Sequence, residues 1–349
     1  MENITYQPQP PGLHIQPLPP RKPSTAWKAV KWIGFLVVVL ICVASVFFNV
    51  ILSAGLVGIS GGAAAPERVI ERHISGPSGM SAASRVAVIT IEGVITGTED
   101  TGPSRWILAQ IKRAREDKKV RAVLLDVDSP GGGITASDVA YNRILDLKKA
   151  NKKVIVLMRD LAASGAYYIS APADEIFAHP TTLTGSIGVV IYGFTIEGLF
   201  QKIGVESVVY KSGPYKDILS PYRPATEEEK KMLQGITDQM FSRFKDIVAQ
   251  GRKLTPEETD AVSTGAIFTA QEAKDRKLID QIGYYEDAVA AARSAAGGAG
   301  VEVVKYERPP TLADILFSSQ TDASKDLQAE LARLIAERKP GLYYIWPGP

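Results

Sequence analysis

The stretch Val154-Ile-Val-Leu-Met-Arg-Asp-Leu-Ala-Ala-Ser-Gly-Ala-Tyr-Tyr168 joins an apolar strand to the start of a helix, with one serine at the junction. The run from Val154 to Met158 is typical of a strand that is buried on both faces. Ser164 follows it between small residues, and a helix is expected to begin at Gly165. A serine at such a junction is either an ordinary helix cap or a nucleophile.

The same alternation of buried strands and helices continues on both sides of this stretch. We expect further strands at residues 86–92, 122–127, 175–178 and 205–210. We expect further helices at residues 104–118, 136–149, 195–203, 227–251, 268–280 and 286–296. This alternation predicts an α/β fold with a mostly parallel sheet flanked by helices.

The composition excludes several classes of function. The formal net charge is +2, so the sequence predicts no nucleic-acid partner. Cys42 is the only cysteine and lies in an apolar segment, so we expect neither a disulfide framework nor a thiol nucleophile. No His, Cys and acidic residues have the spacing of metal ligands, and we expect no metal and no cofactor.

An uncharged apolar segment runs from Trp32 to Ile59, over 59 − 32 + 1 = 28 positions. A helix needs about 20 residues to cross the hydrocarbon core, whereas the core of a cleaved signal has only about 7–15. We therefore predict a single retained transmembrane helix at residues 32–59. Basic residues dominate the flank before it, so the N-terminus should be cytoplasmic and the rest extracytoplasmic at the cell membrane.

The remaining segments follow from composition. Residues 1–31 are rich in Pro and Gln and should form a disordered cytoplasmic tail. Residues 60–84 are predicted to be a stalk linker, and residues 85–298 the folded domain. Residues 299–349 should form a C-terminal extension with an amphipathic helix and an apolar tail. This tail, Leu342 to Trp346, is suited to docking in a groove of its own chain or of a neighbour.

A nucleophilic serine needs a group that takes its proton. Of the three histidines, His14 and His73 lie in the predicted tail and stalk, so a Ser-His-Asp triad would depend on His179 alone. A lysine is the better candidate, and Lys211 and Lys216 both lie in the segment Lys211-Ser-Gly-Pro-Tyr-Lys-Asp217. The residue pattern does not choose between these two lysines.

Three loops of small residues could complete a site. The loop Asp128-Ser-Pro-Gly-Gly-Gly133 follows a strand, and the backbone N–H of Gly131 is a candidate oxyanion donor. The N–H of Gly165 is a second candidate, at the start of a helix. In Thr184-Gly-Ser-Ile-Gly188, Ser186 could orient an amine. Taken alone, the first and third loops are more simply explained as plain turns, and the second as an ordinary serine helix cap.

Together the motifs resemble those of the signal peptide peptidase A family. The resemblance depends on the order and spacing of four motifs of this sequence: Asp128-Ser-Pro-Gly-Gly, Ala163-Ser-Gly-Ala-Tyr-Tyr168, Thr184-Gly-Ser-Ile-Gly-Val189 and Gly213-Pro-Tyr-Lys-Asp217. The resemblance covers roughly residues 85–295 and is to the short form of the family. It implies a Clp protease/crotonase-like fold and a Ser-Lys peptidase domain at residues 85–298. By position it implies Ser164 as nucleophile, Lys216 as general base, Ser186 as the residue that orients the lysine, and Gly131 and Gly165 as oxyanion donors.

The resemblance also implies peptide substrates, namely remnants of signal peptides, and a ring-shaped homo-oligomer in which serine and lysine come from neighbouring subunits. Two alternatives remain open at this point. One is a crotonase-like hydratase or thioesterase acting on acyl-CoA, and the other is a non-catalytic membrane-bound scaffold that binds peptides.

Overall fold

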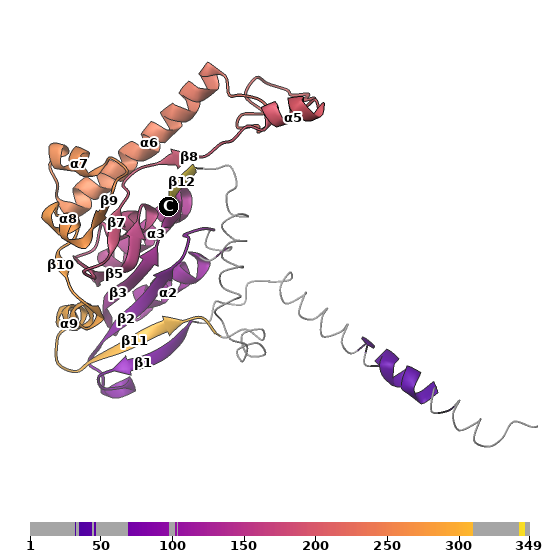
Figure 1. Ribbon diagram of the computed structural model, residues 1–349. Coiled ribbons are helices and arrows are strands. Elements are labelled where there is room, and N and C mark those ends of the chain that lie inside the picture. The colour runs from indigo at the N-terminus through magenta and orange to yellow at the C-terminus, as the bar shows by residue number, and fades with distance from the viewer. Residues whose placement is uncertain are drawn as a thin grey trace, which may run out of the picture. The chain divides into compact units, whose positions relative to one another are not determined.

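The computed structural model of the chain describes residues 32, 35–43, 45–46, 69–97, 102, 104–309 and 342–345 (Figure 1). The chain divides into two compact units, residues 1–65 and 66–349. In the first unit the described residues are helical and exposed, and they cover part of the predicted anchor at 32–59. Among the residues that the structure describes, no helix is long and apolar enough to span a membrane. The predicted tail at 1–31 lies outside the described residues.

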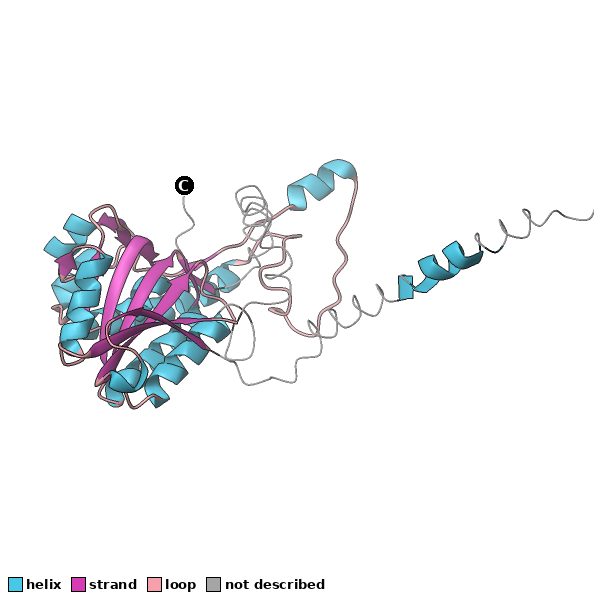
Figure 2. Ribbon diagram, turned by 90° about the horizontal axis from the view of Figure 1, so that it is seen from below, coloured by secondary structure: helices cyan, strands magenta, loops and turns pink. Residues whose placement is uncertain are grey.

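The second unit is built on a large, mostly parallel sheet with helices packed on it (Figure 2). Its strands follow the order β1-β11-β2-β3-β5-β6-β10, while β7 pairs with β5 and β9. Their bounds are β1 Ile70–Ser75, β2 Ser84–Glu92, β3 Val120–Ser129, β5 Lys153–Ala163, β6 Glu175–Ala178, β7 Leu183–Gly185, β9 Ile267–Thr269, β10 Gln281–Ile282 and β11 Val301–Glu307. Only β1–β11 and β7–β9 are antiparallel pairs in this sheet.

A second, small sheet has the order β4-β12-β8 and is antiparallel. Its strands are β4 Gly131–Gly133, β8 Val190–Ile191 and β12 Leu342–Ile345. The helices described in this unit are α2 Ser104–Glu116, α3 Ile134–Lys149, α4 Gly165–Ser170, α5 Glu197–Ile203, α6 Glu227–Arg252, α7 Pro256–Val262, α8 Ala270–Asp275 and α9 Tyr285–Ala295, with a 3-10 turn η1 at Gly79–Ser81.

Alternating side chains of the central strands bury the two faces of the large sheet in separate cores. On β3, Val123 and Leu125 join the core that contains residues of α2, α3, α4 and α6, whereas Leu124 joins the core that contains α9. Burying each such side chain contributes roughly 1.5–3 kcal/mol. A slip by one residue would exchange the two faces, so this packing determines the register of the strands.

The expected α/β fold with a mostly parallel sheet flanked by helices is confirmed, but the folded unit is larger than residues 85–298. Residues 70–75, predicted as stalk, form β1 and pair with β11, and residues 301–307, predicted as extension, form β11 and pair with β2. The sequence did not show this because neither strand contains a long apolar run: charged residues interrupt both β1, at the edge of the sheet, and β11 beside it. The amphipathic helix expected in the extension lies outside the described residues.

The strand predicted at residues 205–210 is wrong. These residues form no regular element and are exposed, with Val208 66% and Tyr210 96% accessible. Their β-branched side chains favour a strand, but no strand among the described residues pairs with them.

Candidate active site

Ser164 lies at the junction of β5 and α4 and has an unusual backbone conformation. Its φ is 54° and its ψ is −114°, and the residue is 1% exposed. Its N–H donates to the carbonyl of Gly185 (2.8 Å), and its carbonyl accepts from Tyr168 N–H (2.9 Å). Its side chain does not cap the helix, so the simple helix-cap interpretation of Ser164 is wrong. A non-glycine residue at positive φ costs on order 1–3 kcal/mol and is typical of functional sites.

The structure places Ser186 beside Ser164. Strand β7 pairs in parallel with β5, with Ala163 opposite Gly185, so each serine is the first residue beyond a paired position. Ser186 is also buried and also at positive φ, 49°, and its N–H donates to the carbonyl of Ala266 (2.7 Å). Two hydroxyls are therefore held at the carboxyl ends of two adjacent strands.

The glycine loop after β3 lies at the same end of the sheet. Ser129 is opposite Ala162 in the β3–β5 pair, two residues before Ser164. Gly131 has a φ of 92°, which only glycine adopts without strain. Its N–H, predicted to hold an oxyanion, donates to the Ser129 hydroxyl (3.1 Å), which in turn donates to the carbonyl of Gly93 (2.6 Å). The sequence analysis did not anticipate this role of Ser129.

Gly132 is the other glycine that the structure singles out. The carbonyl of Gly131 accepts from Ile95 N–H (2.8 Å), and Gly133 N–H donates to the carbonyl of Ile95 (2.9 Å). Backbone groups alternate along a strand, so those of Gly132 face the opposite side, where β12 lies. A Cβ at Gly132 would lie 2.0 Å from the carbonyl oxygen of Ile95. The loop thus requires glycine at this position.

Gly165 is the first residue of α4. The N–H groups of the first helical turn have no partner within the helix, so this donor suits the role of an oxyanion contact. Whether Gly131 or Gly165 serves as an oxyanion donor stays a prediction, as do the roles of the two serines.

The segment that carries the two candidate lysines is exposed. We call residues 192–223 the arm; it contains α5 and stands away from the sheet in Figure 1. Lys211 donates to Asp217 (2.7 Å) and to the carbonyl of Pro214 (3.0 Å), so its ammonium is neutralised by an ion pair. Lys216 is exposed, and its amine makes no hydrogen bond to the described residues of the same chain. Of the two, Lys216 is the lysine that is available to act as a base.

The histidines lie too far from Ser164 to replace a lysine. The N–H of His179 donates to the carbonyl of Met158; the bulge in β5 places Met158 and Ala162 opposite Val127 and Ser129, so the strand advances by roughly 13 Å between Met158 and Ser164. His73 lies on β1, four strands away from β5 or about 19 Å at ordinary strand spacing, and contacts Glu302 (3.3 Å). It is therefore part of the sheet and not of a solvated stalk, while His14 lies outside the described residues.

Strand β12, close to the end of the chain, lies between the glycine loop and β8. Tyr344 is opposite Gly132, Ile345 is opposite Gly131, and Leu342 is opposite Ile191. The same strand contacts α4, the helix that follows Ser164. An extended segment of polypeptide thus occupies the edges of β4 and β8 beside the candidate site. The sequence predicted that residues 342–346 dock in a groove, and the four of them that the structure describes, 342–345, pair in this way.

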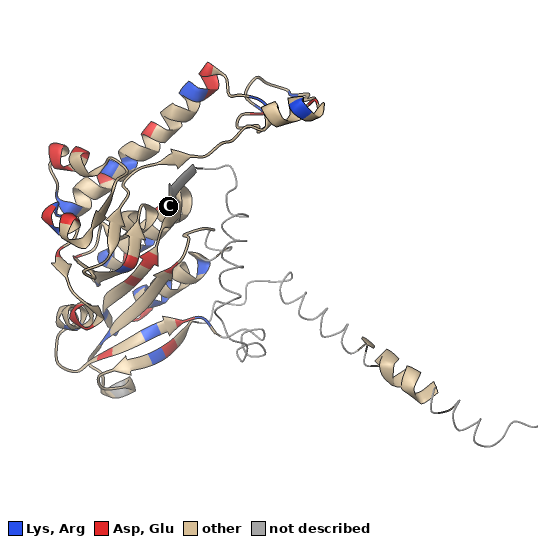
Figure 3. Cartoon of the chain, viewed as in Figure 1, with Lys and Arg blue, Asp and Glu red and all other residues tan. Residues whose placement is uncertain are grey.

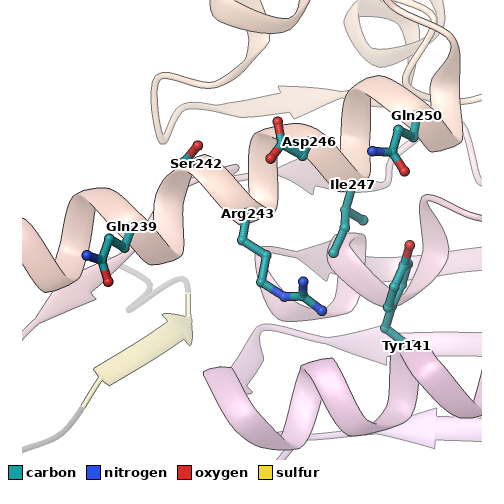
Figure 4. A pocket seen from close by; sticks show the side chains of 7 residues that line it. All are labelled: Tyr141, Gln239, Ser242, Arg243, Asp246, Ile247 and Gln250. Carbon is teal, nitrogen blue, oxygen red and sulfur yellow. The ribbon is translucent and has the colours of Figure 1, made fainter.

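A separate hollow of about 430 Å³ lies between α3 and α6 (Figure 4). Arg243 reaches across it from α6, and Tyr141 lines it from α3. Arg243 binds the carboxylate of Asp138, which also accepts from the buried hydroxyl of Tyr168 (2.6 Å). None of the predicted site residues lines this hollow, and its ion pair serves to fasten α4 to its neighbours.

Comparison with known proteins decides the family. The family described as Peptidase family S49 matches residues 146–298. A candidate signal peptide peptidase SppA of Enterococcus faecium is 37% identical over 237 residues, covering 65% of this chain and 68% of that protein. The chain belongs to peptidase family S49.

Other members of the family are also similar to this chain. Protease 4 of Salmonella typhi is 37% identical over 248 residues, which cover 70% of this chain and 40% of that protein. The chloroplastic serine protease SPPA of Arabidopsis thaliana is 36% identical over 244 residues, which cover 66% of this chain and 36% of that protein. This chain therefore spans well under half the length of these two S49 relatives, and family membership identifies it as a serine protease.

Proposed function

We propose that this S49 chain is a membrane-anchored serine endopeptidase in which Ser164 is the nucleophile and Lys216 the general base. The observation that carries the proposal is the backbone of Ser164, buried and held at positive φ at the end of β5, directly beside Ser186. Strained residues of this kind persist only where the surrounding structure holds them, and they cluster at active sites.

The proposed chemistry balances protons as follows. The neutral amine of Lys216 takes the hydroxyl proton of Ser164 while the serine oxygen attacks the scissile carbonyl. Backbone N–H groups, with Gly131 and Gly165 as the candidates, hold the oxyanion, and the lysine ammonium then protonates the leaving amine. Lys216 next takes a proton from water, which attacks the acyl ester; as the Ser164 oxygen leaves, the lysine ammonium returns that proton to it, and both residues regain their starting forms. Ser186 orients the amine.

Extended peptides are the proposed substrates. The support comes from β12, which shows that the edges of β4 and β8 accept a strand beside the candidate site. Strand addition gives affinity through main-chain bonds and is a common way to bind peptides. Remnants of signal peptides, which are mainly apolar, are the substrate class that we propose. The fold that this implies is of the Clp protease/crotonase-like type.

The site is proposed to be completed by a second copy of the chain in a ring-shaped homo-oligomer. A lysine acts as a base only where burial among apolar groups makes it neutral, and Lys216 is exposed in one chain. The arm also exposes large apolar side chains, among them Phe194 (67%) and Ile203 (61%), and Figure 3 shows charged residues of both signs on the same arm. Such a surface suits an interface.

The proposed location is the cell membrane, with a cytoplasmic N-terminus and an extracytoplasmic catalytic unit. The uncharged run from Trp32 to Ile59 and the basic flank before it support this orientation. An extracytoplasmic site also disfavours the acyl-CoA alternative, because acyl-CoA is cytoplasmic.

The decisive experiment combines peptide hydrolysis with labelling by an active-site serine reagent. The full chain should hydrolyse an apolar fluorogenic peptide and take up the label, and Ser164→Ala should do neither. Ser137→Ala is the matched control, since Ser137 is fully buried in α3 and its hydroxyl has no hydrogen-bond partner. Hydrolysis that persists in Ser164→Ala would refute the proposal, and thiol release from acyl-CoA would favour the hydratase or thioesterase alternative. Peptide binding without label or turnover in the wild-type chain would favour a scaffold.

A further inference from the structure

The Arg223 guanidinium connects the arm to the start of α6 through ion pairs with Asp217 and Glu229. Arg223 donates to Asp217 through Nε (2.8 Å) and Nη2 (2.7 Å). It also donates to Glu229 through Nη1 (2.8 Å) and Nη2 (2.5 Å). Each carboxylate therefore accepts two hydrogen bonds from the guanidinium, a bidentate geometry that arginine permits and lysine does not. We call this arrangement of Asp217, Arg223 and Glu229 the fork.

On one side of this fork, Asp217 directly follows Lys216. The backbone here forms successive turns, with Lys216 N–H donating to Gly213 (3.2 Å) and Ser220 N–H donating to the carbonyl of Asp217 (3.0 Å). Leu219 has a φ of 64°, which only a firmly held turn tolerates in such a residue. The fork therefore holds the turn that contains Lys216 in place.

On the other side, Glu229 belongs to the start of α6. Its carboxylate accepts from Thr226 N–H (2.8 Å), and the Thr226 hydroxyl accepts from Glu229 N–H (3.2 Å), which is a complete capping box. Helix α6 has 26 residues and buries Phe244, Ile247 and Val248 in the main core. Figure 1 shows it running from the body of the unit towards the arm. The fork therefore connects the turn to a rigid element.

The charges of the fork are matched. Lys211 and Arg223 face Asp217 and Glu229, two cations against two anions. Hydrogen bonds from Arg223, and then from Lys211, hold the pKa of Asp217 well below its usual range. Hydrogen bonding to Arg223 lowers the pKa of Glu229 to about 2. Both carboxylates stay ionised at neutral pH, so the hydrogen bonds of the fork persist there.

From this geometry we propose that Arg223 is a positioning residue for the general base, because its fork fixes the Lys216 turn to the N-terminus of α6. The inference rests on the proposed function, in which Lys216 takes the proton of Ser164. Contacts of Asp217, Arg223 and Glu229 within one chain therefore determine where the Lys216 side chain points. This orientation exists before a second copy of the chain covers the lysine. Arg223 touches neither the substrate nor the serine, and it acts through the backbone of the turn.

The test is Arg223→Gln in the full chain, with Arg252→Gln as the matched control. Arg252, at the other end of α6, makes an ion pair of the same length with Asp280 (2.7 Å) and is only 7% exposed. A displacement of about 1 Å in a catalytic group can cost on order 100-fold in rate. We expect Arg223→Gln to lower kcat about 10- to 100-fold while KM changes less than about threefold, since β4 and β8 are untouched. Arg223→Lys, which keeps the charge but not the fork, should recover part of kcat.

The control should lose thermal stability without a comparable loss of kcat. Arg223→Gln with wild-type kcat, or with a kcat loss equal to that of Arg252→Gln, would overturn the inference. If Arg223→Gln does not fold, Asp217→Asn removes one side of the fork. It should likewise lower kcat while KM changes less than about threefold. Lys216→Ala distinguishes the two levels of the argument. If Lys216→Ala is inactive and Arg223→Gln is fully active, only the positioning role falls; if Lys216→Ala is fully active, the proposed function falls with it.

Discussion

The end of the sheet that carries Ser164 and the arm that carries Lys216 are built in opposite ways. Ser164 and Ser186 are buried, and parallel strand pairing fixes their relative position. The arm is largely irregular and exposed, with Lys216 at its surface. One chain therefore preorganises the proposed nucleophile completely but leaves the proposed base in water. This difference is what a site completed by a second copy would require.

The largest effect should come from separating the two lysines of the arm. Lys216→Ala should lower kcat/KM by about 10²–10⁴, which is the usual contribution of a general base. Lys211→Ala removes only an ion pair with Asp217 and should retain some activity. In the wild type, activity should rise with pH, because only the neutral amine accepts a proton. A pH–rate profile that stays flat down to about pH 5 would contradict a lysine base.

The part of the site that contains Ser164 can be disrupted by a substitution in the glycine loop, Gly131–Gly133. Gly132→Ala places a Cβ where the Ile95 carbonyl already lies, at 2.0 Å, so the loop must move. We expect kcat/KM to fall on order 100-fold, as measured with the fluorogenic peptide. Gly235→Ala is the control: nothing lies within 4 Å of the added carbon on exposed α6, and alanine should stabilise the helix by about 0.5–1 kcal/mol. Equal activity of the two variants would show that the loop plays no part in the site.

The arm can be tested through its apolar surface. The double variant Val208→Glu and Tyr210→Glu should abolish self-association in sedimentation experiments and lower activity about 10-fold or more, since charges on an interface core cost several kcal/mol. The fold of the single chain should not change, as read by circular dichroism, because both side chains are exposed in one chain. Lys231→Glu, on the polar surface of α6, is the control for charge. A fully active monomer would contradict a shared site.

A direct form of the same test mixes two inactive proteins. Ser164→Ala and Lys216→Ala chains, assembled together, should recover part of the activity, since some sites would then contain an intact serine and an intact lysine. Complete absence of recovery in verified mixed oligomers would show that serine and lysine come from one chain.

A smaller effect is expected at β12. If this strand occupies the edges of β4 and β8 nine-tenths of the time, removing residues 342–349 should lower the apparent KM about 10-fold. Tyr344→Pro retains the length of the chain but removes an N–H that strand pairing uses, and it should act in the same direction. Deletion without any change in activity, assembly or stability would exclude a role for the tail.

The smallest effect concerns the Arg223 fork and pH. The pKa of Glu229 is lowered from 4.5 to about 2, so its stabilising contribution is complete above pH 4.5 and is lost as the pH falls towards 2. The difference in melting temperature between the wild type and Arg223→Gln should therefore be constant from pH 6 to 8 and shrink below about pH 4.5. A difference that grows in acid would show that the fork does not hold an ionised Glu229.

Local patterns predicted much of this architecture. The apolar run at residues 154–158 lies within β5, and the amphipathic pattern at 227–251 corresponds to α6. The patterns failed where stability depends on a distant partner. Strand β1 exists because β11 pairs with it, from more than 220 positions further along the chain, and residues 205–210 lack a partner despite their β-branched side chains.

The candidate site divides in the same way. Small residues after apolar strands marked Ser164, Ser186 and the glycine loop, because few other residues tolerate such sharp turns. The ion pair of Lys211 with Asp217 and the fork of Arg223 join residues only six positions apart, but they could not be read from spacing, because an irregular turn has no fixed period that brings given positions together.

The sequence by itself determined most of the strands and helices in the core, though not β11, because hydrophobic periodicity and turn chemistry act over a few residues. It also pointed to a serine at the end of β5. Only the tertiary structure decided that Ser164 and Ser186 are neighbours, that the histidines are remote, and that Lys216 and not Lys211 is unpaired among the described residues. The first two outcomes depend on pairing between separate strands of the sheet, and the third depends on an irregular turn whose contacts follow no period, so the local pattern does not contain them.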